Sequence, residues 1–583
     1  MSFTFTVSAA DWGRIAPLIV LAATALLVLL ADLFLSRPAQ GQKGNVGVPL
    51  AGTLGGGANT GTLGGGPNVA SSPDALPFNF LALPFLSLLG LLGAFAATIV
   101  LFIVGDYQPA FNSMIGSDEG SLFAYIIIIS ASFLAILLSP GYLKRLNIIH
   151  QGEYYALMLL ATVGMMIMAA ATSFLTIFLG IEMLSLALYI LCGFVARRVT
   201  SQEAGMKYFL LSSFASAFLL YGIAMTYGAT GNTSFTSIRS YLAAHTSSTT
   251  LLLIGMGLLI VGFAFKVSAV PFQAWTPDVY DGAPAPVTAF MSVGTKAAAL
   301  IAFARVFDVA LLPIQTTWEP VIWAIAILTI VGGNVLALAQ NNVKRLLAYS
   351  SIAHAGYLLI GVVVGSIVGL SAILFYLLCY TFLNLGAFGV VTVLENADNS
   401  GNGLSEIRGL WYRQPLLAGI LALFMLALAG FPPMAGFAAK YYIFYAALQG
   451  GHPELLIIGV LASVLGMYYY LRVIAAMFME REAAPVPGQA QGAVPTGVAA
   501  GRRASSKLSN GAPAGAATAV AVKPAAGSRT KSSPLVKTVE TRPVAWTTWL
   551  ALGVALVGTF LMGTLLPFWL VGLAQQCAQM MLR

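Results

Sequence analysis

Four lysines and one glutamate lie inside stretches that are otherwise almost entirely apolar. Lys266 lies in LLIVGFAFKVSAVPF, Lys296 in VTAFMSVGTKAAALIAF and Lys440 in GFPPMAGFAAKYYIFYA. Lys207 lies nearer the start of its stretch, in EAGMKYFLLSSF, where a long side chain could extend to solvent. Glu182 lies in LTIFLGIEMLSLALYI. A lysine in apolar surroundings can release its proton, whereas an arginine keeps it, so four lysines without an arginine favour proton transfer.

The alternative interpretation is that these charges only pair with one another. A charge at the centre of a bilayer costs about 2.5–3.5 kcal/mol, and a single glutamate cannot neutralise four lysines. Glu182 could still be the structural partner of one lysine. In the proton-transfer interpretation we expect Glu182 to pair electrostatically with Lys207 on the adjacent helix, so that Glu182→Gln impairs proton pumping with little loss of assembly. His354, in YSSIAHAGYLL, is either a hydrogen-bonded core residue or a relay group that titrates near neutral pH, and both interpretations stay open.

Prolines lie close to two of the lysines. Pro271 follows Lys266 by five residues, and Pro432 and Pro433 precede Lys440 by eight and seven. Proline removes an intrahelical hydrogen bond, and broken helices at mid-membrane commonly mark ion sites in transporters. The spacing therefore predicts two broken helices, each beside a buried lysine.

The composition places these residues in a membrane. Hydrophobic residues make up 58% of the chain and charged residues 8%, against about 25% charged residues in soluble domains. The sequence predicts an all-α polytopic membrane protein of about 14 transmembrane helices. The expected spans are 14–35, 79–105, 121–139, 155–171, 173–195, 203–227, 251–272, 284–304, 321–340, 347–366, 369–393, 416–446, 454–478 and 547–572. The broken helices are numbers 7 and 12, which are oppositely directed, as an inverted five-helix repeat requires.

Two segments interrupt the apolar pattern. Residues 36–77 are Gly-rich and contain GTLGGG twice, which predicts a flexible linker and not a phosphate loop, because no polar helix follows. Residues 480–546 are rich in Ala, Gly, Pro, Ser and basic residues and predict a disordered basic loop. The predicted organisation is thus a first helix in 1–35, a core of helices 2–13 in 78–479, and a last helix with its tail in 547–583.

Basic residues outside the spans are distributed unevenly. With the N-terminus outside, 20 of the 28 Lys and Arg residues fall on the inner side and four on the outer side. This asymmetry predicts that both termini are outside and the basic loops cytoplasmic. The net charge of +8 is then a topology signal, and we expect no nucleic-acid partner. Cys192, Cys379 and Cys577 are too far apart in sequence to suggest a disulfide framework or metal site.

The stretch FKVSAVPFQAWTPDVYDGAPAPVTAFMSVGTKAA, at residues 265–298, resembles the signature of subunit N of proton-translocating NADH-quinone oxidoreductase, respiratory complex I. EAGMKYFLLSSFASAFLLYG and GFPPMAGFAAKYYIF resemble the same family, and the likeness covers roughly residues 75–480. Related antiporter-like subunits are expected to carry a WLPDA-type sequence where this chain has WTPDVY. The 36–77 and 480–546 segments depart from compact members of the family.

The resemblance implies a function and a set of roles. Glu182, Lys207, Lys266, Lys296 and Lys440 match the charged residues of helices 5, 6, 7, 8 and 12, which would form a proton path across the membrane plane. Electron transfer from NADH to quinone would occur in partner subunits, which would hold FMN and the iron–sulfur clusters, while this chain would hold no cofactor. The expected partners are the other complex I subunits, including neighbouring antiporter-like subunits, and the lipid bilayer of a bacterial inner membrane.

Two other functions stay open from the sequence. The chain could be a subunit of a multisubunit cation/proton antiporter, or a structural scaffold in which the lysines are merely paired. Co-purification with NADH-oxidising and iron–sulfur subunits would separate complex I from the antiporter. The electron donor, NADH or ferredoxin, is likewise open.

The charge distribution makes a direct prediction about topology. Cysteine labels placed in the 36–77 and 480–546 segments should react only from the cytoplasmic side, because both segments follow odd-numbered helices of a chain whose N-terminus is outside. The measurement is labelling by an impermeant thiol reagent in right-side-out and inverted vesicles. Labelling of either segment from outside would contradict the helix count or the orientation.

Overall fold

The computed structural model describes residues 8–35, 79–148, 151–245, 249–479 and 543–582. Within these ranges every regular element is a helix, so the predicted all-α class is confirmed. The predicted 36–77 linker and nearly all of the predicted 480–546 loop lie outside the described residues.

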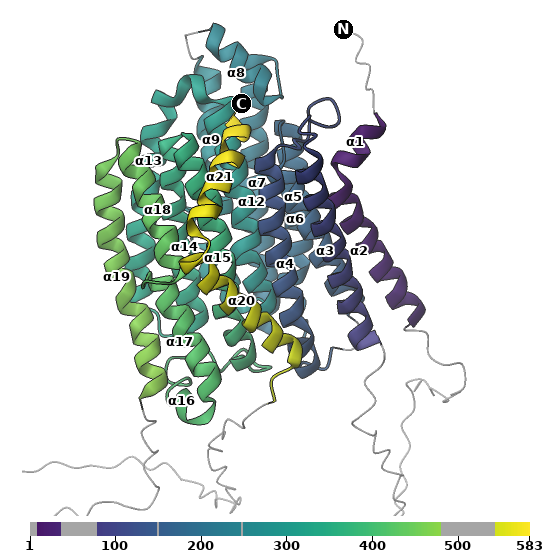
Figure 1. Ribbon diagram of the computed structural model, residues 1–583, viewed down its shortest axis with the longest axis vertical. Coiled ribbons are helices and arrows are strands. Elements are labelled where there is room, and N and C mark those ends of the chain that lie inside the picture. The colour runs from purple at the N-terminus through teal and green to yellow at the C-terminus, as the bar shows by residue number, and fades with distance from the viewer. Residues whose placement is uncertain (1–7, 36–78, 149–150, 246–248, 480–542, 583) are drawn as a thin grey trace, which may run out of the picture. The chain divides into compact units, whose positions relative to one another are not determined.

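The helices follow one another along the chain with short connections between most of them (Figure 1). In order they are α1 (Ala9–Arg14), α2 (Ala16–Leu35), α3 (Asn79–Val104), α4 (Glu119–Arg145), α5 (Gly152–Ala169), α6 (Phe174–Cys192), α7 (Val199–Thr230), α8 (Phe235–Ala244), α9 (Thr250–Val267), α10 (Trp275–Gly282), α11 (Ala285–Phe290), η1 (Met291–Thr295), α12 (Lys296–Ala304), η2 (Arg305–Ala310), η3 (Leu312–Ile314), α13 (Gln315–Leu338), α14 (Val343–Val364), α15 (Ile367–Leu394), α16 (Leu410–Arg413), α17 (Pro415–Ala429), α18 (Ala435–Gln449), α19 (Pro453–Phe478), α20 (Trp546–Thr564) and α21 (Pro567–Leu582).

The number of membrane crossings agrees with the predicted fourteen. Among the described residues, 13 helices are long and apolar enough to span a bilayer. The remaining predicted span, 416–446, is divided between α17 and α18, of 15 residues each, which are too short to span alone and would cross the bilayer only together. The predicted last span, 547–572, is instead two helices, α20 and α21, because the second begins at Pro567, whose ring suits a first helical turn but not a helix interior.

Both predicted helix breaks are present. Helix α9 ends at Val267, Ser268 takes a left-handed conformation with φ of 65°, and the chain becomes helical again at Trp275. Helix α17 ends at Ala429 and α18 begins at Ala435. The inverted repeat that would relate these two breaks stays a prediction.

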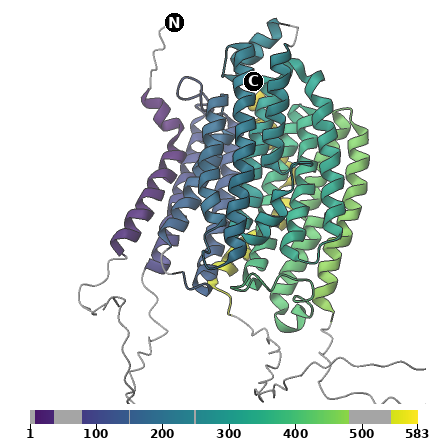
Figure 2. The ribbon, with the colours of Figure 1, turned by 180° about the vertical axis from the view of Figure 1, so that it is seen from behind.

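The helices that carry the candidate residues lie in the middle of the bundle. Figures 1 and 2 show α2 and α3 at one edge and α19 at the opposite edge, with α20 and α21 crossing one face obliquely. The span Ala285–Ala310 is entirely buried within the described residues, and α14 is nearly so. Lys296 and His354 therefore lie on the two most enclosed spans.

Glycines let the central helices approach closely. A Cβ added at Gly222 of α7 would lie 2.9 Å from the backbone nitrogen of Leu259 in α9, and one added at Gly333 of α13 would lie 2.6 Å from that of Ala353 in α14. Small residues at such crossings allow dense packing where lipid gives no hydrophobic driving force. These close contacts hold α9, which carries Lys266, against α7, and α14, which carries His354, against α13.

Candidate functional site

Lys266 is held at the end of α9, directly before the first break. Its side chain is buried, and Nζ donates hydrogen bonds to Ser185 Oγ at 2.8 Å and to Ser212 Oγ at 2.7 Å. These serines lie on α6 and α7, so three helices meet at one ammonium group. Glu182, one turn from Ser185 on α6, interacts electrostatically with Lys266.

The break beside Lys266 is stabilised by side chains from elsewhere. The backbone nitrogen of Val270 donates to Thr329 Oγ1 at 2.9 Å, and Trp275 Nε1 donates to the carbonyl oxygen of Phe265 at 3.2 Å. Pro271 has no N–H to satisfy. Backbone groups that the interruption frees thus find partners inside the protein, as irregular backbone in a membrane must.

Lys207 does not pair with Glu182, so that sequence-based prediction is wrong. Its Nζ lies 2.7 Å from Glu203 Oε1 and 3.0 Å from Asp278 Oδ2, and its side chain is 41% exposed. Glu203 is one helical turn before Lys207, a spacing that could have suggested this pair. Asp278 lies in the WTPDVYDG segment of α10, and no sequence spacing connects it to Lys207.

Lys296 lies at the start of α12, after the π-helical segment η1, and is bound by a single residue. Its buried Nζ donates to the carbonyl oxygen of Ser351 at 2.6 Å and to Ser351 Oγ at 2.5 Å. Ser351 lies on α14, one turn before His354. Helix α14 therefore connects the lysine of α12 to the histidine.

His354 is buried between the two lysines that follow Lys266 along the chain. Its ring nitrogens contact two tyrosine hydroxyls, that of Tyr376 at 2.6 Å from Nδ1 and that of Tyr470 at 3.2 Å from Nε2. It interacts electrostatically with both Lys296 and Lys440. Its hydrogen bonds fit a satisfied core histidine, and its place between the lysines fits a relay group.

Lys440 lies beside the second break, as the prolines at 432 and 433 predict. Its Nζ donates to the carbonyl oxygen of Ala429 at 3.0 Å and to Ser463 Oγ at 2.9 Å, and it lies 5.6 Å from the centre of the Tyr357 ring. Ala429 is the last residue of α17, so its carbonyl is free because the helix stops there. The break supplies a ligand for the lysine directly.

The three deep lysines thus share one kind of environment. Within the part of the chain that the structure describes, each is bound by serine hydroxyls or backbone carbonyls, and none forms an ion pair. Hydroxyls and carbonyls can hydrogen-bond both an ammonium and a neutral amine, whereas a carboxylate in contact fixes the charged form. This arrangement suits groups that change protonation.

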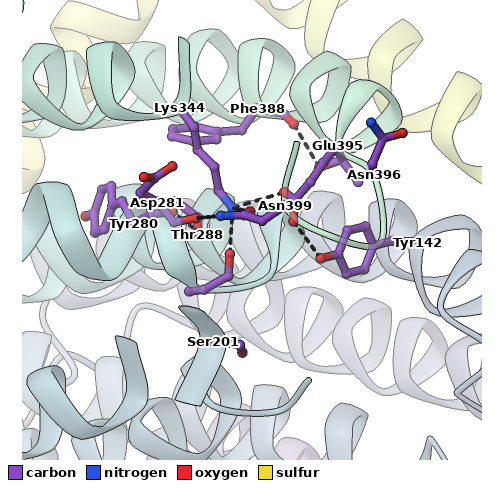
Figure 3. A network of polar contacts seen from close by, with 12 residues as sticks. Tyr142, Ser201, Tyr280, Asp281, Thr288, Lys344, Phe388, Glu395, Asn396 and Asn399 are labelled. Atoms are coloured by element: carbon purple, nitrogen blue, oxygen red, sulfur yellow. Dashed lines mark hydrogen bonds and ion pairs between the residues drawn. The ribbon is translucent and has the colours of Figure 1, made fainter. Parts of the chain in front are cut away.

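Sequence reasoning missed a second buried network, at the end of the bundle that carries the basic loops. Figure 3 shows Lys344 and Tyr142 pointing toward Glu395. Lys344 Nζ donates to Glu395 Oε2 at 3.0 Å and to the carbonyl oxygen of Ala283 at 2.6 Å. Glu395 Oε1 accepts from Arg198 at 2.5 Å and from Tyr142 at 2.8 Å.

This network corrects the count of loop cations. The 20 inner-side cations of the sequence-based prediction include Lys344 and Arg198, but their side chains are almost wholly buried around the Glu395 carboxylate. Glu395 follows the apolar span 369–393. Its position in the sequence does not predict that it pairs with Lys344, 51 residues away, or with Arg198, 197 residues away. The cluster joins the ends of α4, α7, α14 and α15.

The comparisons with known proteins agree with this arrangement. Residues 171–466 match the family described as NADH:quinone oxidoreductase/Mrp antiporter, TM. The NADH-quinone oxidoreductase subunit N of Trichlorobacter lovleyi is 47% identical over 399 residues, which cover 68% of this chain and 81% of that protein. This chain belongs to the NADH-quinone oxidoreductase subunit N family. The region matched by the family contains all six candidate residues from Glu182 to Lys440.

Solved structures of two kinds of membrane complex contain chains with a similar fold. A chain of respiratory complex I from Thermus thermophilus is 30% identical, with a TM-score of 0.61 over 80% of this chain and 91% of that chain. A chain of the Mrp complex from Dietzia sp. DQ12-45-1b has a TM-score of 0.72 over 98% of this chain and 99% of that chain, at 20% identity. The latter shows the fold alone. The fold is therefore shared with antiporter complexes, and the sequence identity favours the subunit N family.

The Glu395 network leads to a prediction about stability. Glu395→Gln would leave Arg198 and Lys344 buried without their counter-charge, and breaking a buried pair in this way costs about 3–5 kcal/mol. We expect a clearly lower thermal unfolding midpoint in detergent. Asp106→Asn, which removes an acid paired with Arg14 near the surface, is the control and should change stability by less than about 1 kcal/mol. An unchanged midpoint for Glu395→Gln would contradict the role of the network.

Proposed function

We propose that this chain is a membrane-arm subunit of complex I that translocates protons, driven by electron transfer from NADH to quinone in partner subunits. The proposed path comprises Glu182, Lys207, Lys266, Lys296, His354 and Lys440. The observation that supports it best is that Lys266, Lys296 and Lys440 are buried and bound by neutral groups. A scaffold would be expected to pair such charges with carboxylates, as the Glu395 network does.

The roles differ along the path. Glu182 modulates the charge of Lys266, with which it interacts electrostatically. Lys207 is 41% exposed between Glu203 and Asp278, whose carboxylates favour its charged form, so we assign it a positive charge that acts on the path from the small cavity that these residues line with Arg345. Lys296, His354 and Lys440 would transfer protons laterally along the helices that surround α14. Pro271, Pro432 and Pro433 act by keeping helices broken beside Lys266 and Lys440.

The assembly and orientation are part of the same proposal. We assign NADH, FMN, the iron–sulfur clusters and quinone to partner subunits, and we expect neighbouring antiporter-like subunits to contact this chain within the lipid bilayer. Arg14 of α1 binds Asp106 before α4, and Met581 of α21 packs against Gly120 of α4, so both ends of the described chain lie at one end of the bundle (Figure 1). We place that end outside and the Glu395 end in the cytoplasm of a bacterial cell.

Substitution of Lys266 separates proton exchange from fixed charge. Lys266→Ala removes both the charge and the proton site, whereas Lys266→Arg keeps the charge but cannot release a proton. We expect both variants to lose most of the quinone-coupled proton pumping in membrane vesicles, normalised to assembled complex.

Asp106→Asn serves again as the control and should pump normally. Near-normal pumping by Lys266→Arg would show that only the positive charge matters and would exclude a relay role for Lys266. Near-normal pumping by Lys266→Ala would exclude Lys266 from the mechanism altogether.

A further inference from the structure

An aspartate that is not among the proposed path residues is buried near the end of the span Ala285–Ala310. Asp308 lies in η2, is 1% exposed, and neither of its carboxyl oxygens has a hydrogen-bond partner among the described residues. A buried carboxylate without partners is costly, so the group must either carry a proton or contact water. A buried carboxyl group with a purely structural role would be expected to have a hydrogen-bond partner.

The arginines of η2 and α8 both bind groups other than Asp308, although Arg305 Nε has no hydrogen-bond partner among the described residues. Arg305, in the same π-helical segment, donates from one guanidinium nitrogen to both oxygens of Asp118 at 2.8 Å and to Ser121 Oγ at 2.6 Å. Arg239 of α8, which packs against η2, donates to the carbonyl oxygen of Leu582. Among the residues that the structure describes, Asp308 therefore forms no ion pair, whereas Asp118 pairs with Arg305.

Asp308 faces the turn that ends α14. A Cβ added at Gly365 would lie 3.5 Å from Asp308 Oδ1 and 3.2 Å from Gln315 Nε2, so both side chains reach over the same glycine. Gln315 in turn donates from Nε2 to Glu319 Oε2 at 3.1 Å. Asp308 therefore lies near Gln315, the first residue of a polar chain on α13, without a hydrogen bond between the two side chains.

That polar chain leads to the surface. Glu319 Oε1 lies 3.6 Å from His452 Nε2, and His452 Nδ1 lies 3.2 Å from Glu454 Oε1. The side chains are 28%, 18% and 42% exposed respectively. Two carboxylates and an imidazole thus lead from Gln315, which lies over the same glycine as Asp308, to the exposed start of α19.

We propose that Asp308 is a proton-release residue of the path, and that the Glu319–His452–Glu454 cluster accepts its proton. The inference rests on the proposed function above and assigns the outer end of that path. Asp308 lies 12 residues after Lys296 on the same helical span, about 18 Å along its axis at 1.5 Å per residue. In this proposal water carries the proton from the Asp308 carboxyl to Glu319 or His452, from which it reaches solvent, and water between Asp308 and Lys296 reloads the carboxylate. Gln315 positions Glu319 by its hydrogen bond and carries no charge.

The test compares two substitutions that differ in proton exchange. Asp308→Asn keeps the shape of the side chain but cannot exchange a proton, and we expect proton pumping per assembled complex to fall several-fold. Asp308→Glu restores a carboxyl group and should retain at least half of normal pumping. The matched control is Asp106→Asn, which removes an acid at the same end. The Arg14 guanidinium beside Asp106 holds the pKa of that carboxyl below its ordinary value, and this variant should pump normally.

Each outcome decides the inference. Normal pumping by Asp308→Asn would overturn it, and so would an Asp308→Glu variant that assembles but pumps as poorly as Asp308→Asn. If Asp308→Asn does not assemble, the partly exposed His452 provides the test. Slower pumping by His452→Gln would support the release cluster, and normal pumping would overturn the inference. Failure of the proposed function is recognised separately, because Lys266→Ala would then pump normally.

Discussion

The cost of a charge in an apolar, low-dielectric interior constrains every other feature of this molecule. An unpaired charge at the centre of a bilayer costs several kcal/mol, yet a tightly paired charge cannot change its protonation freely. The deep lysines avoid both extremes, because serine hydroxyls and backbone carbonyls solvate Lys266, Lys296 and Lys440 without neutralising them. The membrane core therefore contains lysines that are hydrogen-bonded but have no contacting counter-charge, so their protonation state can change.

The helix breaks follow from the same constraint. An intact helix binds its own carbonyls, so it has none to offer a buried ammonium. Interrupting α17 at Ala429 frees a carbonyl that binds Lys440, and interrupting α9 places Lys266 where α6 and α7 supply serines. The Glu395 network has the opposite arrangement, because there a carboxylate pairs directly with the buried cations. Glu395 binds Arg198 and Lys344 directly and holds the helix ends that carry the basic loops.

The features that the sequence predicted are those that depend on local physics. A lysine in an apolar stretch and a proline beside it are visible in sequence, so the lysines, both breaks and fourteen crossings could be predicted. Lateral partners could not, because they join helices far apart in the chain. Ser351 gave no signal as the ligand of Lys296, and Glu182 was assigned to Lys207, its neighbour in helix order, when it interacts with Lys266. Asp308 could not be recognised from the sequence, because only the packed structure shows that its buried carboxyl group has no hydrogen-bond partner among the described residues.

The central claim is that the deep lysines work because their ligands are neutral, and Ser351→Asp tests it most directly. The introduced carboxylate would replace the hydroxyl that lies 2.5 Å from Lys296 Nζ and would pair with the ammonium permanently. The measurement is proton pumping by the assembled complex in proteoliposomes, with Ser351→Asn as the neutral control. The account predicts that the aspartate variant assembles but loses pumping, while the asparagine variant retains much of it. Normal pumping with a fixed carboxylate beside Lys296 would contradict the account.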